Sequence, residues 1–143
     1  MTDWQQLLDG ARVSVRLRAP AARTAIREAE AQLGHALPPQ LSALLEQTDG
    51  FHDVAGRYEP CWPLARLVEE NHRVRRDAVM PRPDGKLCFG DNGAGEPFLL
   101  VASTAQEWGE DVRVWSWIDQ EARSLAPSLA AFWEGWLDGS ISS

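Results

Sequence analysis

Residues 26–50, IREAEAQLGHALPPQLSALLEQTDG, restrict the fold more than any other stretch, because they predict two short helices joined by a tight turn. Gly34 predicts a left-handed cap at the end of the first helix, and Pro20 suits its first turn. The second helix is expected to begin at Pro38-Pro39 and to stop at Asp49-Gly50. The first helix has apolar residues at helical spacing: Ala22, Ile26, Ala29 and Leu33. Helices this short are marginal alone, so their apolar sides must pack against the rest of the chain.

The remaining residues predict an α+β fold. Behind the capping candidates Thr2 and Asp3, residues from Trp4 onward have helical spacing. Residues 12–18 alternate between apolar and polar side chains, which indicates either a half-buried strand or an extended linker. Further patterns predict a helix over 64–76, strands over 86–90, 97–102 and 112–118, a fourth short strand within 119–124, and a closing helix over 126–139. We therefore expect N-terminal helices, a central, mainly antiparallel sheet and a closing C-terminal helix in one domain, residues 1–143.

The net charge of −7 is confined to one part of the chain. Residues 84–143 hold ten acidic side chains against three basic ones, whereas residues 1–83 hold eleven of each sign. Such a negative region repels nucleic acid and favours a basic partner, although acidic surfaces also serve solubility alone. Five arginines between Arg12 and Arg27 have no aromatic residues among them, so a solvated surface explains them better than a nucleic-acid site.

The sequence also bears on location. No apolar run reaches the roughly 18 residues of a membrane span, and the opening MTDWQQLLDG lacks the basic and apolar blocks of a signal peptide. Cys61 and Cys88 do not form a CxxC motif, so we expect two reduced, buried cysteines. These features predict a cytoplasmic protein without membrane contact.

Part of the two-helix segment follows a spaced pattern of Glu, Leu-Gly and Leu-Pro. It reads Glu30-Ala-Gln-Leu33-Gly34-His-Ala-Leu37-Pro38-Pro-Gln-Leu41. This pattern resembles the SUKH superfamily, and more narrowly its SMI/KNR-type family, named after fungal cell-wall assembly regulators. The similarity continues through Trp62-Pro63-Leu64, residues 89–95 and residues 126–139. The chain departs from the family pattern at Asp49, where Asn is more usual, and in its high tryptophan content.

The resemblance implies a binding role without catalysis. Bacterial SUKH proteins are largely thought of as immunity proteins that bind toxin domains, many of them nucleases or deaminases. We therefore expect an immunity protein that neutralises a basic, nuclease-type toxin domain by occlusion. One alternative is a housekeeping regulatory or scaffold protein of the cell-wall-assembly-regulator type. Another is a small-molecule-binding protein or enzyme that uses a cleft around Gly50–Tyr58.

The motifs of the sequence also favour a protein that is not an enzyme. The sequence contains no GxSxG, HExxH, P-loop or GxGxxG motif. In residues 91–96, Gly93 and Gly95 stand where a calcium loop needs oxygen ligands, so a turn between strands is favoured. Glu69 and His72 have the spacing of half a carboxylate-bridged metal site, but no second half is present. We expect no catalytic residue, no cofactor and no metal.

Acidic residues near tryptophans are the candidate contacts to a partner. Tryptophan beside carboxylates suits an interface that is anchored by an aromatic side chain and steered by charge. Trp115 and Trp117 are expected to share one face of the third strand, where they either form an exposed aromatic surface or cover a second face of the core. The candidate partner-binding residues are Asp91, Glu96, Glu107, Trp108, Glu110, Asp111 and Asp119.

Overall fold

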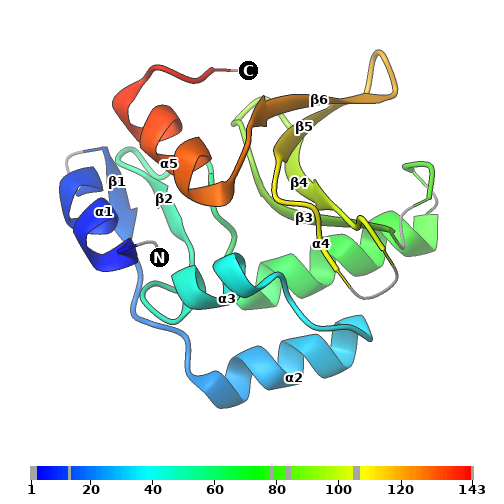
Figure 1. Cartoon of the computed structure of the whole chain (residues 1–143), viewed down its shortest axis with the longest axis horizontal. Coiled ribbons are helices and arrows are strands. Elements are labelled where there is room, and N and C mark those ends of the chain that lie inside the picture. Colours follow the sequence, from blue (N-terminus) through cyan, green and yellow to red (C-terminus); the bar gives the residue numbers. More distant parts are fainter. Residues whose placement is uncertain (1–2, 13, 78, 83–84, 105–106, 143) are drawn as a thin grey trace.

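The computed structural model describes residues 3–12, 14–77, 79–82, 85–104 and 107–142 (Figure 1). Its helices are α1 (Trp4–Ala11), α2 (Arg23–Leu33), α3 (Pro39–Leu45), α4 (Leu64–Asp77) and α5 (Leu129–Asp138). Its strands are β1 (Val15–Leu17), β2 (Phe51–Asp53), β3 (Lys86–Asp91), β4 (Pro97–Val101), β5 (Val112–Ser116) and β6 (Glu121–Ala126). The α+β class predicted from the sequence is confirmed.

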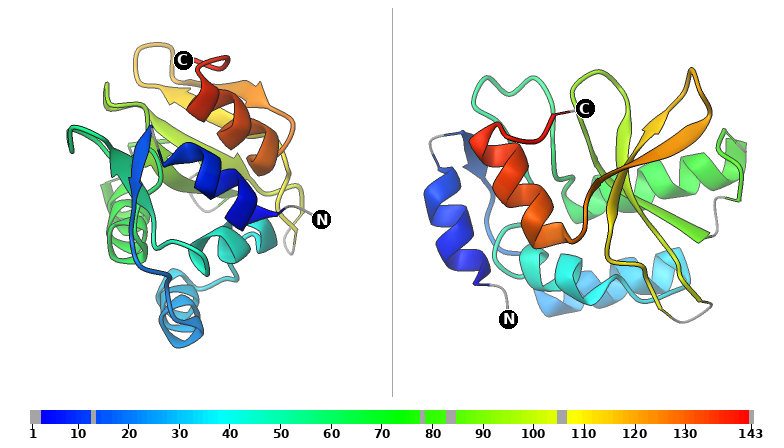
Figure 2. Two further views of the ribbon diagram at one scale, coloured as in Figure 1. Left: turned by 90° about the vertical axis from the view of Figure 1, so that its left-hand side faces the viewer. Right: turned by 45° about the horizontal axis from the view of Figure 1, so that its top comes forward.

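The strands form two antiparallel sheets. β1 pairs with β2, and the larger sheet has the order β3-β4-β5-β6, so that consecutive strands are neighbours. Helices α4 and α5 lie on opposite sides of the larger sheet (Figure 2). On the α5 side, Phe98 of β4 packs edge-on against Phe132 and Trp136, with ring centroids 4.8 and 4.9 Å apart. This aromatic cluster forms the centre of the core.

The turn between α2 and α3 explains the Glu, Leu-Gly and Leu-Pro pattern. Gly34 has a φ of +85°, and its amide donates to the Glu30 carbonyl at 2.9 Å. The Glu30 carboxylate reaches across the turn and accepts from the Leu37 amide at 2.7 Å. Pro39 then occupies the first position of α3, where a helix needs no amide hydrogen. The pattern therefore specifies one turn with its polar backbone groups satisfied.

The structure corrects several boundaries. α2 begins at Arg23 rather than at Pro20, because backbone hydrogen bonds from Ala21 to Leu45 and from Asp49 to Ala19 hold the preceding segment against the end of α3. α3 ends at Leu45, before Asp49, whose carboxylate instead accepts from the first amide of α4 at 2.8 Å. Asp3 does cap α1, accepting from the Gln6 amide, whereas Thr2 lies outside the described residues.

A strand was missed in the segment after Gly50. The sequence patterns assign residues 51–53 to no helix or strand, but they form β2, which pairs with β1. The strand interpretation of residues 12–18 is therefore correct for Val15–Leu17, while position 13 lies outside the described residues. β6 also extends further than expected, to Ala126.

Trp115 lies in β5 and Trp117 directly follows that strand, and both pack against other residues of the protein. Trp115 is only 3% exposed, and the Trp117 ring lies 6.0 Å from it and is itself partly buried. Of the two alternatives left open by the sequence, the covered second face of the sheet is therefore correct, and the exposed aromatic surface is wrong. Ile118, expected at the end of the strand, lies in the following turn and is 93% exposed.

Candidate partner-binding site

The candidate contact residues do not form one surface, because they divide between two ends of the larger sheet. Three of them, Asp91, Glu96 and Asp119, lie at the end that carries the β3–β4 and β5–β6 turns, which we call the turn end. The other four, Glu107, Trp108, Glu110 and Asp111, lie in the β4–β5 connection at the opposite end. Five-residue strands put roughly 17 Å between the two ends.

The second of these ends carries a groove, and we call it the groove end. The groove is lined by residues of the α2–α3 turn and of the β4–β5 connection. It has a volume of about 1040 Å³. Its walls include Leu37, Pro38, Pro39, Leu100, Trp108 and Leu129, with Glu107 and Glu110 also lining it. An apolar hollow with a few polar groups is the usual form of a binding site.

Trp108 is held in the groove wall by contacts to the α2–α3 turn. Its indole nitrogen donates to the Ala36 carbonyl at 3.2 Å, and its ring centroid lies 5.2 Å from that of His35. His35 is fixed in turn by Arg75 of α4, whose Nη2 lies 2.8 Å from the imidazole Nε2. Because a guanidinium only donates, Nε2 must accept, which places the His35 proton on Nδ1, 3.0 Å from the Ala36 carbonyl. The wall is therefore ordered before any partner binds.

The β4–β5 connection presents two carboxylates beside this wall. A backbone bridge joins Ala102 to Trp108, and the Gly109 amide donates to the Val101 carbonyl at 2.7 Å. Glu107 and Glu110 are exposed and make no ion pair with a described residue. Asp111, by contrast, pairs with Arg113 at 2.9 Å, so its charge is largely neutralised. Glu107 and Glu110 are therefore the acidic residues of this end that remain available to a partner.

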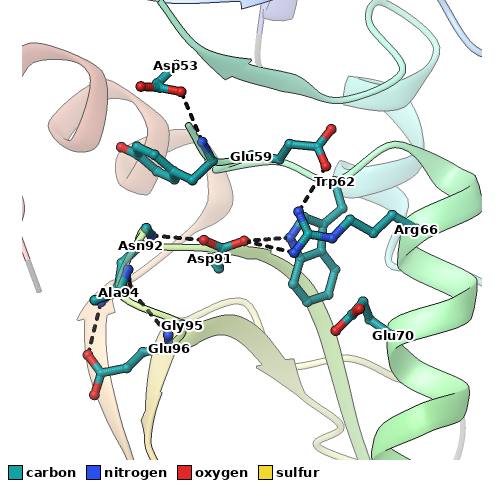
Figure 3. Close-up of polar contacts among 12 residues, drawn as sticks. Asp53, Glu59, Trp62, Arg66, Glu70, Asp91, Asn92, Ala94, Gly95 and Glu96 are labelled. Atoms are coloured by element: carbon teal, nitrogen blue, oxygen red, sulfur yellow. Dashed lines mark hydrogen bonds and ion pairs between the residues drawn. The ribbon is translucent and has the colours of Figure 1, made fainter. Parts of the chain in front are cut away.

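Asp91 has a structural role, as Figure 3 shows. It is 8% exposed, and its Oδ2 accepts from the Trp62 indole at 2.9 Å and lies 3.4 Å from Arg66 Nη2. Its Oδ1 accepts from the Gly93 amide at 2.8 Å. Arg66 also pairs with Glu59 at 2.9 Å, so it joins two carboxylates on either side of it. Asp91 is therefore occupied by internal contacts.

The turn end gathers three loops, which follow β2, β3 and β5 (Figure 2, right). Trp117 donates from its indole nitrogen to the Gly95 carbonyl at 2.9 Å, which ties two of these loops together. Glu96 accepts from the Asn92 side chain at 3.0 Å and is partly buried, whereas Asp119 is exposed. No groove lined by both of these carboxylates is found among the described residues.

The unequal charge of the two halves has a clear structural counterpart. In the N-terminal part, most carboxylates pair with arginines, as in Arg12–Asp9, Arg23–Glu46, Arg57–Asp53, Arg18–Glu59, Arg73–Glu70 and Arg76–Asp77. In the C-terminal part, six exposed carboxylates make no ion pair with a described residue: Glu107, Glu110, Asp119, Glu121, Glu134 and Asp138. The arginines between Arg12 and Arg27 are thus partly neutralised, while the acidic surface is not.

The structure places the residues for which the sequence left a metal site or a small-molecule cleft open. Among the described residues, no group of three or more His, Cys, Asp and Glu side chains is arranged to hold a metal ion. Glu69 is exposed, and the His72 imidazole lies 2.9 Å from the Gln32 carbonyl. Gly50, at the start of the expected cleft, packs directly against the backbone of residues 61–63. None of the described helices is long and apolar enough to cross a membrane.

The two cysteines are expected to be inert in the folded protein. Both are free and buried; burial raises the pKa of Cys88 to about 12 and raises that of Cys61 even further. Because thiolates are the reactive form, neither side chain should react with Ellman's reagent in native buffer, and both should react in concentrated guanidinium chloride. Rapid modification of the native protein would show that one of these thiols is accessible and ionised.

A comparison with protein families identifies the chain. The model of the SMI1/KNR4 family (SUKH-1) matches residues 20–135. The chain belongs to the SMI1/KNR4 (SUKH-1) family. The match runs from the segment before α2 into α5 and so contains both the groove end and the turn end. No curated protein matches the chain. The single domain spanning residues 1–143 stays a prediction.

Sequence reasoning missed the other wall of the groove. Residues 35–40 were recognised only as a turn, although they face the β4–β5 connection. Trp108 and Ala36 are 72 positions apart, so no local spacing indicates their hydrogen bond. The one available signal was a tryptophan in an acidic loop, which pointed to Trp108 but not to its neighbours.

Proposed function

We propose that this SMI1/KNR4-family protein is an immunity-type protein that binds a basic, nuclease-type toxin domain and blocks it by occlusion. It acts by binding rather than by catalysis, and its contact surface is the groove end. The observation that carries the proposal is the pair of unneutralised carboxylates, Glu107 and Glu110, beside an apolar groove walled by Trp108.

The chemistry of the groove end suits such a partner. An aromatic side chain in an apolar hollow provides an anchor, while exposed carboxylates attract Lys and Arg side chains and speed association. A surface that binds nucleic acid is basic, so it is complementary to this end of the protein. The hydrogen bonds of Trp108 and the α2–α3 turn hold the wall in place, which lowers the entropic cost of binding.

The proposal is tested by capturing the partner. Tagged protein is incubated with lysate of its own cells, washed, and eluted by raising the salt concentration, and the eluate is identified by mass spectrometry. We expect a basic protein with a toxin-like C-terminal domain, whose nuclease activity is lost when one equivalent of the immunity protein is added. Recovery of housekeeping proteins alone, with no such activity, would instead favour the regulatory or scaffold function.

Charge reversal at the groove end should slow association with this partner. In the variant E107K/E110K, two negative charges become positive, so the association rate at low ionic strength should fall on the order of tenfold, and the loss should shrink as salt is added. The matched control is E69K/E134K, which makes the same change of charge at two exposed positions that do not line the groove.

The control separates local from general electrostatics. Stopped-flow measurement of the association rate should give a clearly smaller loss for E69K/E134K than for E107K/E110K. Equal losses would mean that only the overall charge matters, and an unchanged rate for E107K/E110K would remove the groove end from the contact surface.

A further inference from the structure

The two outer strands of the larger sheet, β3 and β6, differ in whether other residues cover their free edge. The free edge of β3 is covered: Asn71 of α4 donates to the Cys88 carbonyl and accepts from the Cys88 amide, at 2.8 and 2.9 Å. Residues 59–62 continue this cover, because the Trp62 amide donates to the Phe89 carbonyl at 2.8 Å and the Asp91 amide to the Glu59 carbonyl at 3.3 Å. No strand could add to this edge without displacing these contacts.

The edge of β6 is open. β6 is the last strand of the sheet, and no element lies beyond it in Figure 1. Among the described residues, its backbone makes no hydrogen bond to any element other than β5. Glu121, Arg123 and Ser124 are exposed, and no proline or lysine interrupts the strand. An edge strand of this kind has alternate amide and carbonyl groups ready to pair with another strand.

The side chains of β6 indicate which strand fits. Glu121 and Arg123 are two positions apart and so lie on one face of the strand, and neither makes an ion pair with a described residue. In an antiparallel pair of β6 strands that is centred on Ala122, Glu121 of each copy lies opposite Arg123 of the other. A basic partner would instead meet the like charge of Arg123. The edge is therefore complementary to itself.

We propose that β6 pairs with β6 of a second copy of this chain, forming a two-fold symmetric dimer with one continuous antiparallel sheet. In this arrangement two Glu121–Arg123 pairs flank the two-fold axis, and each copy contributes four strands. No residue of β6 lines the groove, so the dimer does not depend on the proposed toxin.

The same arrangement accounts for Ile118. This side chain is 93% exposed in the β5–β6 turn, although the turn itself is well ordered by hydrogen bonds from the Gln120 amide to Ser116 and from the Gln120 side chain to Trp117, both at 2.8 Å. In the pairing centred on Ala122, the turn of each copy lies beside residues 125–127 of the other. Ile118, which is almost fully exposed in the monomer, is then partly covered by the other copy.

The experiment is sedimentation velocity of the full chain over a concentration series from about 5 to about 500 μM, because a short ladder makes a small interface and a weak dimer. We expect the mass to rise from the 15.9 kDa of the monomer toward twice that value. E121R or R123E alone places like charges opposite each other and should raise the dissociation constant about tenfold. I118K should also weaken the dimer.

The double variant E121R/R123E decides the register. It restores opposite charges across the two-fold axis with no change in net charge, so its dissociation constant should return to near that of the native chain. The controls E28R and R27E make the same single changes of charge at exposed positions of α2 and should leave the dimer unchanged. A monomer at every concentration, single swaps no weaker than their controls, or a double variant as weak as the singles would each overturn the proposal.

Discussion

Replacing Gly90 by alanine is expected to unfold much of the protein. A Cβ atom at this position would lie 1.7 Å from the Pro60 carbonyl oxygen and 2.5 Å from its carbon. Both obstacles belong to the backbone, so no side chain can rotate away to relieve the contact. Residues 59–61 would have to leave β3, and the hydrogen bonds that the Trp62 and Asp91 amides make across this junction would break.

The expected loss is about 3 kcal/mol or more in the free energy of unfolding, at the upper end of what overpacking costs. It is measured by urea denaturation followed by tryptophan fluorescence and circular dichroism. Gly10→Ala is the matched control, because Gly10 is exposed in α1 and a methyl group added there would have no neighbouring atom within 4 Å. That variant should gain about 1 kcal/mol from helix propensity alone. A native denaturation midpoint for Gly90→Ala would contradict the close packing of residues 59–61 on β3.

The junction at Gly90 also shows which features of the structure can be predicted from local sequence patterns and which cannot. The helices, the strands of the larger sheet and the buried cysteines follow from local spacing and turn residues, and these predictions are confirmed. Gly90 itself carries no local signal of its role. Its need to be glycine comes from Pro60, 30 positions away, and its φ is not in the left-handed region that marks a turn glycine.

The candidate contact residues show the same limit. Glu107, Glu110 and Asp119, which charge and composition indicated as partner contacts, are exposed, and their role in binding stays a prediction. Charge and composition could not show that Asp91 is internally paired, because its partners Trp62 and Arg66 come from another part of the chain. Charge and composition also could not show which acidic residues lie at which end of the sheet. In an antiparallel sheet, successive connections lie at opposite ends, so residues that are close in sequence can be far apart in space. Long-range pairing, rather than local pattern, decides which acids share a surface.

The two ends can be told apart by a pair of tryptophan substitutions. Trp108 at the groove end and Trp117 at the turn end are both partly buried, and each donates its indole hydrogen to a backbone carbonyl, at 3.2 and 2.9 Å. Trp108→Ala removes the aromatic anchor of the proposed interface, so it should weaken binding of the proposed toxin partner about 30-fold or more, mostly through faster dissociation. Trp117→Ala removes a similar area from the opposite end and should leave the dissociation constant within about threefold of the native value.

Effects on folding and on binding are distinguished by measuring both the stability and the affinity of each variant. Each should lose comparable stability in urea denaturation, because each gives up one hydrogen bond and one aromatic contact. Only Trp108→Ala should lose affinity in surface plasmon resonance, while Trp108→Phe, which keeps a ring against His35, should retain most of it. If Trp117→Ala weakened binding as strongly as Trp108→Ala, the partner would have to reach the turn end as well, and the groove would not be the anchor of the interface.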